Sequence, residues 1–93
     1  MLDRKIKSHE AVVFTDLDDG SAVLLHLDNK FYYSLNETGS FMWQQIEKNH
    51  GSMGVPQLVQ ALVEQFEVGP EQAVQDVNDF LDDLSREGLV EVK

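Results

Sequence analysis

The chain has 93 residues, no cysteine and 42% hydrophobic residues, and its 17 acidic and seven basic residues give a formal net charge of -10. That length predicts a single domain over residues 1–93, and that hydrophobic content excludes a disordered chain. The charge argues against nucleic acid and other phosphate-rich partners, and the lack of cysteine excludes a disulfide framework and a thiolate metal site.

The N-terminal segment is not expected to be a secretory signal. Residues 1–10, MLDRKIKSHE, contain basic residues but lack the apolar stretch of a secretory signal, and we expect them to be flexible. No apolar run approaches the ~20 residues that a membrane-spanning helix needs. We therefore expect a cytoplasmic protein with no membrane contact.

Three short β-strands are predicted in the first third of the chain. The β-rich runs AVVFTDL (11–17) and SAVLLHL (21–27) are joined by DDG (18–20), a strong hairpin signal. A second polar turn, DNK (28–30), leads into FYYSL (31–35). Consecutive strands with tight turns predict an antiparallel meander.

The third predicted strand runs directly into a helix. Alternation along it places Phe31, Tyr33 and Leu35 on one face and Tyr32 and Ser34 on the other. Asn36 follows, and its side chain can cap the free amides of a helix that starts there.

The rest of the chain is predicted to be helical. A first amphipathic helix ends near Gly51, a second begins around Pro56, and a third runs from Pro70 to a C-terminal cap at Gly88. The final LVEV is typical of a short extended piece. The fold class predicted is α+β, a βββααα order in which a three-stranded antiparallel sheet precedes three helices, as in winged helix-turn-helix proteins.

The third helix decides the question of DNA binding. Its acidic residues are Glu71, Asp76, Asp79, Asp82, Asp83 and Glu87. Only Arg86 opposes them, so phosphate would repel this helix in the recognition position. We expect no nucleic-acid partner, and a winged-helix transcriptional regulator is kept as the alternative from another functional class.

No catalytic motif is present. The three histidines, His9, His26 and His50, are scattered over the N-terminal segment, a strand and a loop. His26 can pair with Asp28, but a strand histidine of this kind is usually half-exposed surface. The aspartates beside the first turn are expected to form that turn rather than a cation site. We therefore expect no enzyme activity, no metal and no cofactor.

Two stretches resemble a known family. YYSLNETG followed by a tryptophan (Tyr32 to Gly39, with Trp43) and DVNDFLDDLSREGLV (Asp76 to Val90) are similar to the PqqD-like family of recognition elements. These proteins serve the maturation of ribosomally synthesised and post-translationally modified peptides. The resemblance runs from about Val12 to the C-terminus.

The resemblance implies a function and a site. Family members bind the N-terminal leader of a precursor peptide and present it to a modifying enzyme: a leader protease, a cyclase or a radical-SAM enzyme. The leader adds as a further strand at the edge of the third strand, in a groove that the third helix closes. The positions that correspond here are Phe31, Tyr32, Tyr33, Ser34, Asp76, Val77, Asp79, Phe80 and Asp83.

The turn before the third strand bears on the pathway. The member that serves pyrroloquinoline quinone synthesis typically has a Pro-Glu pair between the second and third strands, and this chain has HLDNKFYY (26–33) there. The recognition proteins of lasso-peptide pathways are the better match. A chaperone for the quinone precursor remains the alternative within the family.

The aromatic residues of the third strand have two possible uses. Phe31, Tyr33 and Phe80 lie at positions that would be core in any small domain, yet peptide binding also needs side-chain anchors. A strand added through ~4–6 backbone hydrogen bonds, each worth ~0.5–1.5 kcal/mol, roughly offsets the ~2–5 kcal/mol that ordering a disordered leader costs. Tyr33 and Phe80 are the expected anchors, and both readings stay open at this point.

Overall fold

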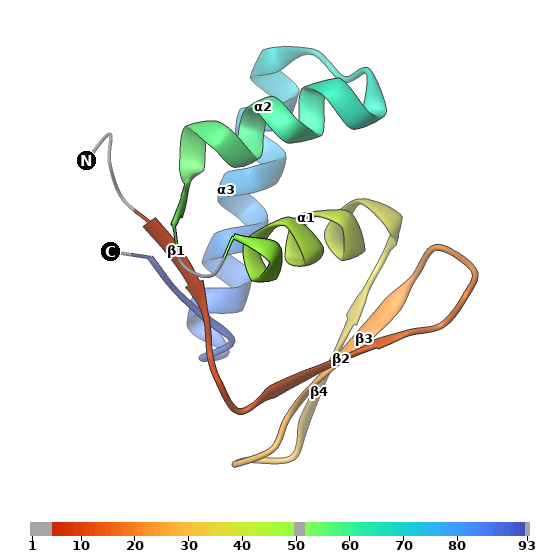
Figure 1. Ribbon diagram of the computed structural model, residues 1–93, viewed down its shortest axis with the longest axis vertical. Coiled ribbons are helices and arrows are strands. Elements are labelled where there is room, and N and C mark those ends of the chain that lie inside the picture. The colour runs from red at the N-terminus through yellow and green to blue at the C-terminus, as the bar shows by residue number, and fades with distance from the viewer. Residues whose placement is uncertain (1–4, 50–51, 93) are drawn as a thin grey trace.

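A computed structural model describes residues 5–49 and 52–92. The elements follow in the order β1 (Lys5–Ser8), β2 (Val12–Asp16), β3 (Ala22–His26), β4 (Phe31–Leu35), α1 (Glu37–Lys48), β5 (Met53–Gly54), α2 (Val55–Phe66), α3 (Pro70–Arg86) and β6 (Val90–Val92). The predicted α+β class is confirmed (Figure 1). The three predicted strands are β2, β3 and β4 and the three predicted helices are α1, α2 and α3, while β1 precedes them, β5 lies between α1 and α2, and β6 follows α3.

The meander predicted from the turn signals forms the larger sheet. Its strands lie in the order β2-β3-β4, all antiparallel. Aspartate side chains close the DDG turn: Asp16 Oδ1 accepts a hydrogen bond from the Asp18 amide at 2.8 Å, and Asp19 Oδ1 accepts one from the Ser21 amide at 2.9 Å. Gly20 adopts a φ of 93° there, a left-handed conformation that glycine takes without steric cost. In the strand order β2-β3-β4, β3 is the central strand and β4 lies at an edge.

A second small sheet corrects the expectation that residues 1–10 are flexible. Residues 5–8 form β1, which pairs with β5 on one side and β6 on the other. Ile6 is fully buried, and it is held opposite Met53 and Val92. Burial of that side chain fixes the strand, while residues 1–4 lie outside the described part. The predicted final extended piece is confirmed as β6, whereas the two-residue β5 was not predicted.

The helix boundaries follow the capping residues. Asn36 Oδ1 accepts a hydrogen bond from the Gly39 amide at 2.8 Å, which confirms the cap predicted for α1. At the end of α3, the Gly88 amide donates to the Ser85 carbonyl and the Leu89 amide donates to the Leu84 carbonyl. With Gly88 at a φ of 75°, this pair of bonds is a Schellman motif. The motif ends α3 and turns the chain sharply, so that β6 begins two residues after Gly88.

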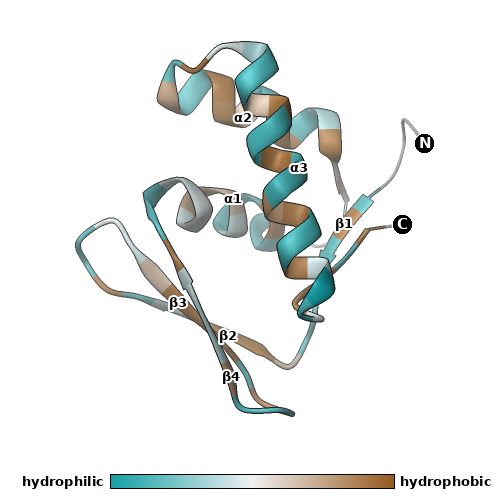
Figure 2. Ribbon diagram, turned by 180° about the vertical axis from the view of Figure 1, so that it is seen from behind, coloured by the Kyte–Doolittle hydropathy of each residue, from teal (hydrophilic) through white to brown (hydrophobic). Residues whose placement is uncertain are grey.

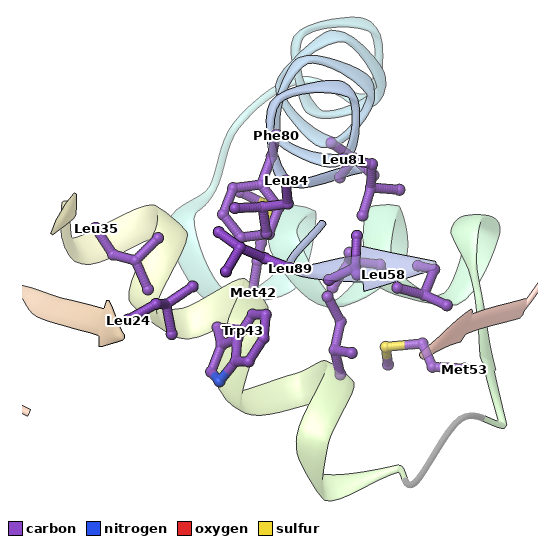
Figure 3. Packing of buried hydrophobic residues seen from close by; sticks show 14 of the residues in the cluster. Leu24, Leu35, Met42, Trp43, Met53, Leu58, Phe80, Leu81, Leu84 and Leu89 are labelled. Carbon is purple, nitrogen blue, oxygen red and sulfur yellow. The ribbon is translucent and has the colours of Figure 1, made fainter. Parts of the chain in front are cut away.

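The core lies where the helices meet the inner face of the larger sheet. Trp43 on α1 is fully buried, as are Leu24 on β3 and Leu84 on α3 (Figure 3). α3 contributes a stripe of five buried residues, Ala73, Val77, Phe80, Leu81 and Leu84. Within the described ranges, no helix has the length and apolar character needed to cross a membrane.

Candidate functional site

A groove of about 650 Å³ lies between the edge strand β4 and the helix α3. In Figure 2 α3 faces the viewer, with hydrophilic and hydrophobic bands alternating along it. Six of the nine residues predicted for the site line this groove: Tyr33, Ser34, Asp76, Asp79, Phe80 and Asp83. The fold therefore brings together two segments that lie more than 40 positions apart in the chain.

Three predicted site residues do not line the groove. Val77 is fully buried in the core stripe of α3. Phe31 is half-buried at the start of β4, and Tyr32 is 67% exposed on the outer face of the sheet. Any role of Tyr32 in the groove must therefore come from its backbone.

Hydrogen bonds at the two ends of the β2–β3 pair fix which backbone groups face which neighbour. The Leu17 amide donates to the Ser21 carbonyl at 3.1 Å, and the Leu27 amide donates to the Ala11 carbonyl at 2.8 Å. Residues of an antiparallel strand alternate between its two neighbours. Odd-numbered positions of β3 therefore face β2, and Leu24 turns its backbone groups toward β4.

The same alternation assigns the outer edge of β4. Leu24 lies opposite Tyr33, so the amide and carbonyl of Tyr33 are directed at β3. The amides and carbonyls of Tyr32 and Ser34 are directed away from the sheet. Because β3 is the only strand paired with β4 among the described residues, these groups form an open edge, and both residues are exposed. An extended peptide can pair with such an edge.

The first turn of α1 closes one end of the groove. A Cβ placed on Gly39 would lie 3.3 Å from Asn36 Oδ1, from a methyl carbon of Leu35 and from the Phe80 ring. That spacing is tighter than ordinary van der Waals contact. Glycine thus allows α1 to approach the Phe80 ring closely. This contact places Gly39 and Phe80 side by side in the lining of the groove.

Comparison with known proteins assigns the chain to a family. The family model described as "Coenzyme PQQ synthesis protein D (PqqD)" matches residues 21–90. The chain belongs to the PqqD family. That match begins just before β3 and ends in β6, so it includes both walls of the groove.

Solved structures share the PqqD fold over nearly the whole chain. One, "TbiB1 in Complex with the TbiA(beta) Leader Peptide", is 32% identical, with a TM-score of 0.81 over 91% of this chain and 94% of that one. Another, "Lasso peptide synthetase B1 complexed with the leader peptide", is 21% identical, with a TM-score of 0.75 over 92% and 96%. A search of curated protein sequences returned no match.

In this PqqD-family protein the α3 side of the groove is acidic. Asp76, Asp79 and Asp83 line it, and Arg86 Nη1 contacts Asp83 Oδ1 at 3.1 Å. Burial raises the pKa of the Tyr33 phenol, and the nearby negative charge of Asp83 raises it further, so the phenol is neutral at physiological pH. Tyr33 can therefore donate a hydrogen bond toward the carboxylate from β4.

Sequence reasoning missed the part of the lining that α1 contributes. Thr38, Gly39 and Met42 face the groove beside Leu35 and Asn36. Asn36 caps α1 as predicted, Gly39 packs closely against Leu35 and Phe80, and both residues also line the groove. Their position at the strand-to-helix junction, directly after the edge strand, was the signal that could have placed this junction in the groove.

Proposed function

We propose that the protein binds the leader of a ribosomally made precursor peptide as an added strand on β4 and presents it to a modifying enzyme. The observation that carries this proposal is the open edge of Tyr32 and Ser34 beside a groove with a part-apolar floor. The TbiB1 relative is described in complex with a leader peptide, which supports the same use of this surface.

Side-chain contacts in the groove are needed for net affinity, because backbone pairing at the edge of β4 contributes too little. Tyr32 and Ser34 together offer two amides and two carbonyls, so four hydrogen bonds would contribute ~2–6 kcal/mol. Ordering a disordered leader costs ~2–5 kcal/mol, which largely offsets that gain. Net affinity must come from leader side chains inserted between β4 and α3. Phe80, Met42 and Leu35 offer apolar contact there.

The role we propose is that of a non-catalytic adaptor in the cytoplasm, where ribosomal precursors are made. The partner enzyme would be a leader protease or cyclase of a lasso-peptide pathway, which the turn at residues 26–33 favours. A second candidate function is delivery of a quinone precursor to a radical-SAM enzyme, which the description of the matching family model supports. The precursor peptide encoded beside the gene would distinguish the two.

Mixing the pure protein with its precursor should produce a complex and no chemical change. We expect saturable binding of a fluorescent leader peptide by anisotropy, and an unchanged precursor mass after prolonged incubation. Cleavage or any mass shift with rigorously purified protein would show that it is an enzyme. Absence of binding to the cognate leader would refute the adaptor role.

Association with a basic leader should slow as ionic strength rises. The chain carries a formal charge of -10, and three carboxylates line the groove. Screening shortens electrostatic attraction to ~8 Å at physiological salt, so rim charges affect the on-rate more than the off-rate. Stopped-flow association over a salt series measures this, with a leader whose Lys and Arg are replaced by Gln as control. An on-rate that is flat for both peptides would mean that the acidic wall does not steer the leader.

A further inference from the structure

Two histidines that are distant in the sequence meet beside the corner that joins the two sheets. His9 follows β1, His26 ends β3, and their ring centroids lie 4.7 Å apart at an interplanar angle of 42°. The expectation that His26 is half-exposed was wrong, because it is only 6% exposed. The exposed Asp28 lies two residues further on. His50 lies outside the described residues.

Backbone contacts hold both rings in place. His9 Nδ1 accepts a hydrogen bond from the Ala11 amide at 3.0 Å, and His26 Nδ1 accepts one from the Asp28 amide at 3.3 Å. The His9 amide in turn donates to the Leu89 carbonyl at 2.9 Å. Neither ring lines the groove between β4 and α3, so the proposed peptide site leaves this pair unused.

The three side chains form a ligand set of mixed nitrogen and oxygen donors. One nitrogen from each ring and one carboxylate oxygen of Asp28 all lie within 4.8 Å of one another. Two imidazoles and a carboxylate are donors that Zn²⁺ accepts, and three protein ligands leave a fourth position for water. Bonds of ~2.0–2.2 Å place such ligands roughly 3.3 Å apart, so ligand atoms must move together by up to about 1.5 Å when the ion binds. Asp28 is exposed in a turn and is the ligand best able to move.

We propose that His9, His26 and Asp28 bind a divalent transition-metal ion, Zn²⁺ by ligand chemistry. The ion would join the β1–β2 connection to the β3–β4 turn and so fix the smaller sheet against the larger one. A neutral imidazole that accepts a bond at Nδ1 carries its proton on Nε2. Coordination through Nε2 must therefore displace the backbone amide from Nδ1. For this reason we expect micromolar affinity, weaker than that of a closed structural zinc site.

The test is a zinc titration of the tag-free, chelator-treated protein by calorimetry, with melting temperature as a second readout. We expect one Zn²⁺ per chain, a melting temperature several degrees higher at saturation, and visible absorption bands of four-coordinate Co²⁺ as a substitute ion. Mg²⁺, which prefers oxygen ligands, should give none of these. Asp28→Asn should weaken zinc binding at least tenfold while the melting temperature without metal stays unchanged.

Two further variants separate a built site from a general attraction of cations to an acidic protein. His9→Gln should abolish the Co²⁺ bands, and circular dichroism checks that the variant stays folded. Asp18→Asn removes an exposed carboxylate from the turn at the other end of the sheet and should bind zinc like the parent protein. No saturable binding by the parent, or equal binding by parent, Asp28→Asn and folded His9→Gln, would overturn the proposal.

Discussion

Proline at position 32 should leave the protein folded and strongly weaken leader binding, whereas proline at position 33 should unfold it. The Tyr32 amide points to the open edge of β4, so its loss breaks no bond within the sheet. The Tyr33 amide is directed at Leu24 on β3, and proline there removes a ladder bond in a half-buried strand. We expect Tyr32→Pro to lower leader affinity at least tenfold, which is ~1.4 kcal/mol.

Circular dichroism and leader anisotropy on the same samples distinguish these outcomes. Tyr32→Ala is the matched control, because it removes the exposed ring and keeps the amide. It should bind the leader nearly as well as the parent protein. If Tyr32→Pro is folded and binds normally, the leader does not pair with β4. If instead Tyr33→Pro is the folded variant, the assignment of inward and outward amides is wrong.

Truncating Phe80 should reduce both stability and leader affinity. Phe80 is 8% exposed, and its ring lies in the core while also lining the groove (Figure 3). Removing a buried aromatic ring costs ~3–5 kcal/mol, a large part of the ~5–15 kcal/mol that stabilises a typical domain. Urea unfolding measures the first effect, and leader binding at a temperature where Phe80→Ala is still folded measures the second. Full leader affinity in the folded variant would exclude Phe80 as an anchor.

A pair of charge reversals on α3 separates the groove from the core. Asp79 and Asp82 are both exposed on the same helix, but only Asp79 lines the groove beside β4. A surface reversal changes stability by no more than ~0.5 kcal/mol, so both Lys variants should melt like the parent. Asp79→Lys should weaken leader binding, and Asp82→Lys should not. Equal effects of the two would mean that overall charge, rather than the groove wall, governs binding.

Local signals predicted the elements that are held by local contacts. Two β-rich runs and the DDG turn located β2 and β3, Asn36 marked the start of α1, and Gly88 marked the end of α3. Each of these depends on residues a few positions apart, which a pattern in one sequence records. The resemblance to a family further predicted that β4 and α3 form the two walls of one groove.

Long-range contacts explain what the sequence did not reveal. Lys5–Ser8 is too short and too basic to read as a strand, and it is ordered by β6, which begins 82 positions after it ends. The burial of His26 likewise depends on His9, from a segment expected to be flexible. Amides alternate in direction along a strand, so only one of the two adjacent tyrosine amides can face outward, and the register across three strands identifies it as that of Tyr32.

The pairing of β1 with β6 makes the domain suited to use as a fused module. Ile6 lies opposite Val92, so the described chain enters and leaves at one place, away from β4 in both views (Figures 1 and 2). Neighbouring ends let a folded unit be joined to, or inserted into, another protein with little strain. An enzyme attached at either end would leave the open edge of Tyr32 and Ser34 accessible. Tethering would then raise the effective concentration of the captured peptide at the catalytic centre without any new contact.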